Sequence, residues 1–374
     1  MSINHRVASF GYTHLADLGA PSEFAHSGVC GVMDMVQALA WVRDNIANFG
    51  GDPSRVMIFG CSGGGWKTST MIGVPAASGL FHRAAIQSGS MLRLFTRERA
   101  TASAEKLLAQ LGISKNNIPD IQKVPWQQLL DAQVGAVRRG AYFSPVQDGD
   151  YIPHHPSYPN APPESASVPF MISTTLEDTV QYYTNFDLDD RGLTALMDSK
   201  FDGKGHEIVS LYRQRYPLKS PYLIQAQVMT DAANRLSATR QAEAKAQQQS
   251  AAPAYLYQWD WPTPPFNGKF GAAHATDAAA SFYNTREPRL GCGSTEGVQM
   301  AERLASAWVA FAKTGDPNND LIPQWEPYGG EMRHTMVFDT ETRLEDNPRA
   351  EIRKYWGSTV GGRVINRAGQ LVDQ

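Results

Sequence analysis

The sequence predicts an α/β fold, in which a mostly parallel sheet carries helices on both faces. Across residues 32–87, short apolar runs of strand length alternate with stretches whose apolar positions recur at helical spacing. The order is helix, strand, helix, strand, which is the order that a parallel sheet requires. The chain has 374 residues, enough to bury a large core, and α/β sheets of this length commonly form one domain. We therefore expect residues 1–374 to form a single domain.

The first part of the chain alternates most clearly. Helical spacing from Val32 to Phe49 is stopped by Gly50-Gly51, and an apolar run from Val56 to Phe59 follows. The predicted elements here are a strand over 2–7, a helix over 32–49, a strand over 56–59, a helix over 66–72, a strand over 83–87, and helices over 101–112 and 126–139. The proline-rich stretch 145–169 is predicted to be a surface connection.

The second part continues the same pattern at wider spacing. The predicted elements are a strand over 168–172, helices over 189–213 and 221–249, a strand over 255–261, a loop over 262–275, a helix over 298–312 and a strand over 336–338. Residues 357–374 are polar and contain glycine, so a loose tail is expected.

A Gly-x-Ser-x-Gly motif at Gly60, Ser62 and Gly64 follows the predicted strand 56–59 directly. The glycines permit a sharp, strained turn, which would raise the serine hydroxyl above the end of the sheet. The backbone N–H of Gly63, at the start of the next helix, would point toward an anion forming on a bound substrate. An incidental serine in a glycine-rich turn is the alternative, and the flanking strand and helix make it the weaker one.

A serine hydroxyl becomes a nucleophile only when a base takes its proton and an acid holds that base in place. His274 follows the predicted strand 255–261 and lies between small residues. Glu177 and Asp178 follow the strand 168–172. The chain order serine, acid, histidine is that of α/β-hydrolases, although most of the nine histidines must be ordinary core or surface residues.

Composition restricts the possible partners. The formal charge is −3, with Lys and Arg scattered along the chain, so a small-molecule partner is expected rather than nucleic acid or anionic lipid. No stretch is apolar enough to span a bilayer, and the first residues show neither a charged leader nor an apolar signal core, so a cytoplasmic location is expected. Cys30, Cys61 and Cys292 lack metal spacing, so free thiols and no metal or cofactor are expected.

Short motifs along nearly the whole chain occur in the order of one known family. They are Asn4-His-Arg6, Gly31-Val-Met-Asp34, Ala40-Trp-Val-Arg-Asp-Asn-Ile46, Phe49-Gly-Gly-Asp-Pro53, Phe59-Gly-Cys-Ser-Gly-Gly-Gly65, Gly79-Leu-Phe-His-Arg83, Gln87-Ser-Gly89 and Thr314-Gly-Asp-Pro317. Together they resemble the type-B carboxylesterases, which include the cholinesterases and many bacterial esterases. The resemblance implies an α/β-hydrolase fold and hydrolysis of carboxyl esters.

The resemblance places the family's nucleophile at Ser62 and its base at His274. The family's acid position falls on Asp178, because its Asp-Glu pair stands here in the order Glu177-Asp178. Glu177 is the alternative, and Asp178 is preferred because a shift of one residue on a strand reverses the side-chain direction. Ser88 matches a family serine that hydrogen-bonds the acid, so Ser88 and Glu177 are expected to support the site.

Four other residues near the motif could contribute to it. Cys61, beside the nucleophile, is expected to be a packing thiol, because no cation or histidine adjoins it in sequence. Trp66, Phe143 and Phe282 could line an acyl or alcohol pocket, although packing in the core is the more common fate of an aromatic side chain.

The family's oxyanion motif, His-Gly-Gly-Gly or a variant, is absent from this sequence. We therefore expect an N-terminally truncated fold that lacks its first strands, with Gly63 as one remaining oxyanion donor. Each lost donor typically lowers turnover by about 10²- to 10³-fold, so the chain is expected to be a poor esterase. A missing strand would leave a gap or a re-paired strand beside Val56–Phe59 and an exposed edge that promotes self-association.

Three hypotheses of function result. The first is a serine carboxylic-ester hydrolase that acts through an acyl-enzyme on small esters. The second is a catalytically inactive fragment or a non-catalytic binding member of the same family. The third, an amidase or carbamate hydrolase, shares the acyl-enzyme chemistry and is not separated from the first by sequence.

Overall fold

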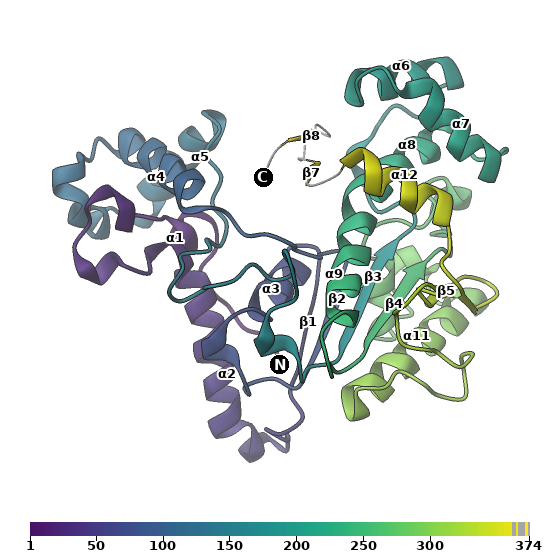
Figure 1. Ribbon diagram of the computed structural model, residues 1–374, viewed down its shortest axis with the longest axis horizontal. Coiled ribbons are helices and arrows are strands. Elements are labelled where there is room, and N and C mark those ends of the chain that lie inside the picture. Colours follow the sequence, from purple (N-terminus) through teal and green to yellow (C-terminus); the bar gives the residue numbers. More distant parts are fainter. Residues whose placement is uncertain (361–363, 366–370, 373–374) are drawn as a thin grey trace. The chain divides into compact units, whose positions relative to one another are not determined.

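The computed structural model describes residues 1–360, 364–365 and 371–372 (Figure 1). The chain divides into two compact units, each built from several segments. The first comprises 1–56, 69–82 and 91–165, and the second comprises 57–68, 83–90 and the chain from residue 166 onward. The single domain expected over 1–374 stays a prediction.

The first unit is helical. Its main helices are α1 (Ala8–Tyr12), α2 (Cys30–Asn45), α4 (Arg97–Leu111) and α5 (Trp126–Arg138), so the helices predicted over 32–49, 101–112 and 126–139 are confirmed. The strand predicted over 2–7 is wrong, because these residues form neither helix nor strand. The Arg6 backbone N–H donates to the Asp34 carboxylate at 2.8 Å, and the Arg6 guanidinium binds the same group. The Arg6 N–H therefore binds the Asp34 side chain of α2, whereas in a strand it could donate to the carbonyl of a neighbouring strand.

The main sheet belongs to the second unit and has six strands, in the order in which they occur in the chain. They are β1 (Met57–Cys61), β2 (Arg83–Gln87), β3 (Phe170–Thr175), β4 (Ala254–Trp259), β5 (Thr335–Phe338) and β6 (Arg343–Glu345). The first five are parallel, and β6 pairs antiparallel with β5. The predicted α/β fold with a mostly parallel sheet is therefore confirmed, while β6 was not predicted.

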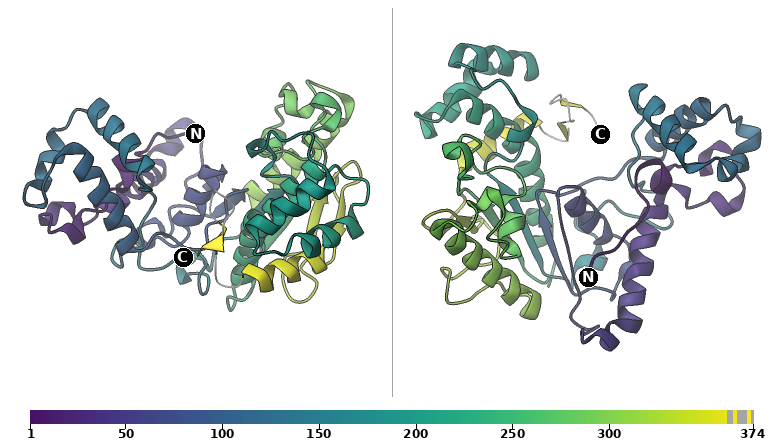
Figure 2. Two further views of the ribbon diagram at one scale, coloured as in Figure 1. Left: turned by 90° about the horizontal axis from the view of Figure 1, so that it is seen from above. Right: turned by 180° about the vertical axis from the view of Figure 1, so that it is seen from behind.

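Helices cover both faces of the central strands (Figures 1 and 2). Every residue of β3 and β4 is buried. On one face, Tyr255 of β4 contacts Phe311 of α11 (Thr295–Thr314). Leu256, on the opposite face, lies with Leu236 of α9 (Leu236–Ala246). Alternate residues of one strand therefore enter two separate packed layers, as in a doubly covered sheet.

Strand β1 differs from the central strands. Among the described residues it pairs only with β2, and Phe59 at its centre is 43% exposed. The Phe59 ring contacts Trp308 and Phe282, with centroids 5.6 and 5.5 Å away. The predicted self-association through an exposed sheet edge concerns this strand and stays a prediction.

Two predicted long helices are interrupted. Residues 189–213 form α6 (Asp190–Lys200) and α7 (Gly205–Arg215), separated at Asp202 and Gly203, which both have positive φ. Residues 221–249 form α8 (Pro221–Thr230) and α9, joined by a π-helical turn, η9 (Asp231–Arg235). A π turn holds one residue more than an α turn, so the regular α-helical geometry is interrupted at η9.

The remaining elements follow the predictions with two exceptions. The helix predicted over 298–312 is α11, and the short α10 (Thr276–Ser281) inside the site region was not predicted. The loose tail predicted over 357–374 is wrong for its first residues, because α12 (Ala350–Val360) buries Trp356 and Val360. Short strands β7 (Val364–Ile365) and β8 (Leu371–Val372) pair with each other, and the other tail residues lie outside the described part. In the described residues, no helix is both long and apolar enough to cross a membrane.

Candidate active site

Ser62 lies between β1 and α3 (Gly63–Met71) in a sharp turn. Its φ is +57°, a left-handed conformation that costs a serine about 1–3 kcal/mol and persists only where the surroundings enforce it. The Ser62 N–H donates to the Gln87 carbonyl of β2 at 2.8 Å, and the Ser62 carbonyl accepts from Trp66 N–H at 3.0 Å. One residue thus ends the sheet and starts the helix, which is the strand–turn–helix predicted at this motif.

Close backbone contacts hold the turn. A Cβ added to Gly60 would lie 2.4 Å from the Gly64 carbonyl carbon, and one added to Gly89 would lie 2.4 Å from the Ser62 carbonyl oxygen. Gly64 has open space at the same position. Gly60 is therefore needed for close approach, whereas Gly64 is not. Gly63 is the first residue of α3, so its N–H is one of the helix-start donors without a carbonyl partner in its own helix.

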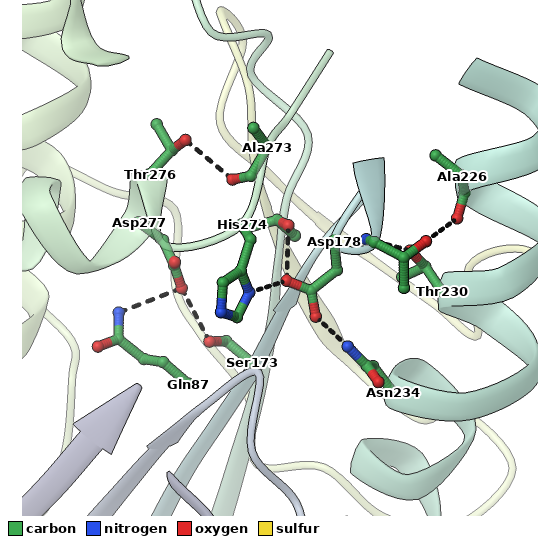
Figure 3. A network of polar contacts seen from close by, with 12 residues as sticks. Gln87, Ser173, Asp178, Ala226, Thr230, Asn234, Ala273, His274, Thr276 and Asp277 are labelled. Atoms are coloured by element: carbon green, nitrogen blue, oxygen red, sulfur yellow. Dashed lines mark hydrogen bonds and ion pairs between the residues drawn. The ribbon is translucent and has the colours of Figure 1, made fainter. Parts of the chain in front are cut away.

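Asp178 lies beyond the end of β3 and is fully buried. His274 Nδ1 lies 2.6 Å from Asp178 Oδ1 (Figure 3). The other carboxylate oxygen accepts from Asn234 Nδ2 at 2.5 Å, and Thr175 Oγ1 donates to Oδ1 at 3.2 Å. The predicted acid and base are therefore in contact, and a proton on Nδ1 that is donated to Asp178 would leave Nε2 as an acceptor.

Asn234 and Thr175 were missed in the sequence. Asn234 belongs to the π turn η9, inside a predicted uninterrupted helix, and nothing in its spacing marked it. Thr175 stands three residues before Asp178 at the end of β3. Its position at the end of a predicted strand was the one sequence signal that could have placed it near the acid.

Electrostatics around His274 favour its protonated form. Burial alone lowers the pKa of the imidazole, but the hydrogen bond and charge of Asp178, together with the charge of Asp277, outweigh it and raise the pKa above its ordinary value. Arg289 Nη1 donates to the His274 carbonyl at 3.2 Å, and its charge opposes the rise. The surroundings therefore stabilise an imidazolium at this position.

Glu177, the alternative acid, faces a different set of partners. One carboxylate oxygen binds Lys219 Nζ at 2.6 Å and Gln227 Nε2 at 2.7 Å, and the other accepts from the Ala272 N–H at 2.7 Å. A Cβ on Gly271, whose φ is +58°, would lie 2.5 Å from the Glu177 carboxylate. Glu177 thus fixes the loop that carries His274, while Asp178 contacts the imidazole.

The hydrogen bond expected from Ser88 to the acid is absent, since the buried Ser88 hydroxyl has no partner among the described residues. Ser88 instead shares with Ser62 a positive φ, here +47°. A second buried carboxylate, Asp277, stands three residues after His274. Its Oδ2 accepts from Gln87 at 3.1 Å and from Ser173 at 3.0 Å (Figure 3). It also accepts from Tyr257 Oη at 3.0 Å. Burial raises the pKa of Asp277, and these three donors oppose the rise.

The other residues that the sequence singled out lie apart from these contacts. Burial, together with the charges of Asp277 and Asp178, raises the pKa of the Cys61 thiol well above its ordinary range, as expected for an unreactive thiol. Phe143 packs against the buried cluster around Leu107 in the first unit. Phe282 is exposed beside Phe59, and Trp66 is partly buried. Within the described residues, no group of three His, Cys, Asp or Glu side chains could hold a metal ion.

Comparison with known proteins identifies the family. The sequence model of the carboxylesterase family matches residues 1–356. The chain belongs to the carboxylesterase family. Para-nitrobenzyl esterase of Bacillus subtilis (strain 168) is 32% identical over 365 residues, which cover 95% of this chain and 72% of that protein. Phenmedipham hydrolase of Pseudarthrobacter oxydans is 28% identical over 368 residues, covering 91% and 69%.

Solved structures agree with this carboxylesterase assignment. A carboxylesterase of Geobacillus stearothermophilus matches with a TM-score of 0.78 and 30% identity, over 94% of this chain and 74% of that chain. A para-nitrobenzyl esterase structure matches with a TM-score of 0.76 and 31% identity, covering 94% and 73%. The resemblance to type-B carboxylesterases and the α/β-hydrolase fold are therefore confirmed, and the chain is an ester hydrolase by family.

Proposed function

We propose that this carboxylesterase cleaves small carboxylic esters through an acyl-enzyme on Ser62, with His274 as the base and Asp178 as the acid that orients it. The observation that carries the proposal is the 2.6 Å contact of His274 Nδ1 with a fully buried Asp178, which leaves Nε2 to accept a proton. The strained turn at Ser62 supports it, because such strain concentrates at functional sites. The similarity to esterases makes a small ester the expected substrate.

The reaction runs in two halves. Ser62 Oγ attacks the acyl carbon while its proton passes to His274 Nε2, and the bond to the alcohol oxygen breaks as Nε2 returns that proton to the leaving alcohol. A water then attacks the acyl-serine, gives a proton to Nε2, and the acid leaves as Ser62 Oγ recovers the proton. The Gly63 N–H donates to the carbonyl oxygen when it carries negative charge, as one part of the oxyanion hole.

No hydrogen bond joins the Ser62 hydroxyl to His274 in the described structure, and catalytic hydrogen bonds commonly tighten only when substrate binds. The raised pKa of His274 suits its task, since the imidazolium that forms during attack is stabilised by Asp178. Neutral imidazole is the reactive form, so turnover is expected at pH values above this pKa.

The test is active-site labelling of the full chain with a fluorophosphonate, followed by peptide mass spectrometry and turnover of p-nitrophenyl acetate. Stoichiometric label on Ser62, lost together with turnover in Ser62→Ala and retained in the exposed control Ser78→Ala, is the expected result. Label on another serine would refute the assignment. Failure of any serine to react would favour the inactive or non-catalytic alternative.

Bond specificity is tested separately by comparing a p-nitrophenyl ester, the matching p-nitroanilide and a carbamate. We expect the ester to be hydrolysed fastest, and a preference for the anilide or the carbamate would instead favour the amidase or carbamate-hydrolase alternative. The expectations of no cofactor or metal, no nucleic-acid partner, a cytoplasmic location and self-association stay predictions.

A further inference from the structure

A second polar site lies in the second unit, between η9, α9 and the N-terminal end of α12 (Figure 1). It is a cavity of about 20 Å³, which holds roughly one water-sized occupant. Its lining includes four arginines, Arg235, Arg333, Arg349 and Arg353, and one acidic residue, Asp231. Such a concentration of guanidinium groups around so small a space is the feature to be explained.

Two of the four guanidinium groups are neutralised by carboxylates. Arg349 Nη1 donates to Asp231 Oδ1 at 2.8 Å, and its Nη2 binds the other oxygen of the same carboxylate. Arg333 Nε donates to Glu243 at 3.0 Å. Tyr212 Oη also donates to Asp231, at 2.6 Å. These two carboxylates are therefore bound by Arg349 and Arg333, and no hydrogen bond joins them to the other two arginines of the lining among the described residues.

The other two arginines have no carboxylate partner among the described residues. Arg353 Nε donates to the neutral Asn347 side chain at 3.1 Å. Arg235 is only 8% exposed, and its Nη1 is buried without any hydrogen-bond partner. Asp260 lies close enough for its charge to act on Arg235, but its hydrogen bond goes to Gln258, and burial raises the Asp260 pKa to about 6. The charges of Asp231 and Asp260 both act on Arg235, but neither carboxylate binds it, so Arg235 Nη1 is a buried donor without an acceptor beside an open space.

We propose that this cavity binds one small monovalent inorganic anion, chloride under cellular conditions, held by Arg235 and Arg353. The small volume favours a monatomic anion over phosphate or an organic acid, which need more room than one water-sized group. The unpartnered Arg235 Nη1 supplies the donor, and the excess of positive charge selects an anion over a water molecule. The site lies outside the contacts of Ser62, His274 and Asp178, so it does not depend on the proposed hydrolysis.

The test compares thermal unfolding of the full chain in potassium chloride and in potassium gluconate at constant ionic strength. Gluconate is too large for the cavity, so it supplies the ionic strength without the ligand. We expect the Tm of the natural sequence to rise with chloride by roughly 2 °C or more and to saturate, since only a site that fills gives saturation.

Arg235→Gln separates binding from a general salt effect. Because it removes a buried guanidinium donor that has no hydrogen-bond partner, the variant should unfold at an equal or higher Tm in gluconate and should lose the chloride-dependent rise. The control Arg215→Gln, at an exposed arginine of α7, should keep that rise. An identical, non-saturating response in all three proteins would overturn the proposal.

Bromide provides a readout that needs no variant. Crystals of the natural sequence soaked in sodium bromide should show an anomalous peak in the cavity, within hydrogen-bond distance of Arg235. A water in that position with no anomalous signal at saturating bromide would refute the site, whatever the thermal data show.

Discussion

The ends of β1 and β3 carry the two halves of the site, and they are built in different ways. At the end of β1, the position of Ser62 is set by the backbone, through a φ of +57° and contacts that leave no room for a Cβ on Gly60. At the end of β3, the position of Asp178 is set by side-chain donors from Asn234 and Thr175, in a strand with every residue buried. The β1 end therefore depends on the absence of a Cβ at Gly60, whereas the β3 end depends on the donors that hold Asp178.

The largest expected effect lies at the β3 end. Asp178→Asn keeps the shape but removes the charge that stabilises the imidazolium and fixes its tautomer, so kcat should fall by roughly 10³- to 10⁴-fold, as in other serine triads. Glu177→Gln, the neighbouring control, should lower kcat much less and mainly reduce stability, because Glu177 holds Lys219 and the His274 loop. Steady-state kinetics and thermal unfolding of both variants provide the measurement, and the reverse ranking would transfer the acid role to Glu177.

The next effect lies at the β1 end. Gly60→Ala places a Cβ against the Gly64 backbone and should displace Ser62, with a loss of about 10²-fold or more in kcat and about 1–3 kcal/mol or more in stability. Gly64→Ala is the matched control, since its Cβ meets open space and alanine is the better helix former. Both variants are assayed for turnover and urea unfolding. Equal behaviour of the two would show that close approach does not position the serine.

A smaller effect is expected when one donor is removed from the acid. Asn234→Ala deletes a 2.5 Å hydrogen bond to Asp178 but leaves the charge and the imidazole contact, so kcat should fall about tenfold, equivalent to about 1.4 kcal/mol. The control is Asn185→Ala, whose amide donates to Gln225 on α8, away from the acid. An unchanged kcat in Asn234→Ala would indicate that Thr175 and His274 suffice to hold Asp178.

The smallest effect is a shift in pH dependence. Because the pKa of His274 is raised, kcat/KM should fall on acidification through a pKa above the ordinary ~6.5 of histidine. The same shift means that His274 adds stability below its unfolded pKa and that this contribution is lost as pH rises through the folded pKa. In Asp178→Asn the residual activity should titrate at lower pH. A profile centred well below 6.5 in the natural sequence would contradict this picture.

The residues of the candidate site that local sequence patterns mark could be predicted from the sequence. Ser62 was marked by its glycines, and His274 and Asp178 by their places after predicted strands and by the family resemblance. The contact between His274 and Asp178 agrees with the rule that residues after parallel strands meet at one edge of the sheet. The fold class followed for the same reason, because alternating strand and helix patterns leave few topologies.

The parts that failed depend on contacts between distant segments. The strand predicted over 2–7 does not form, and the Arg6 N–H instead donates to Asp34 of α2. Local β propensity cannot predict a contact with a residue so distant in sequence. Ser88 was expected to reach the acid, but the donors that do so come from η9 and from β3 itself. The resemblance to the family predicted a serine role at position 88, but it did not give the backbone geometry that determines which group the Ser88 hydroxyl can reach.

The π turn η9 has a consequence for insertions and deletions in this chain. A π turn accommodates one residue more than an α turn, so deleting one residue between Asp231 and Arg235 would let α8 and α9 merge into a continuous α-helix and would change the side-chain directions within the turn. Asn234 would then turn away from Asp178. Chain length at this turn is therefore more tightly constrained than composition, and a one-residue deletion should do more damage than any single substitution within it, measurable as lost turnover and lowered Tm.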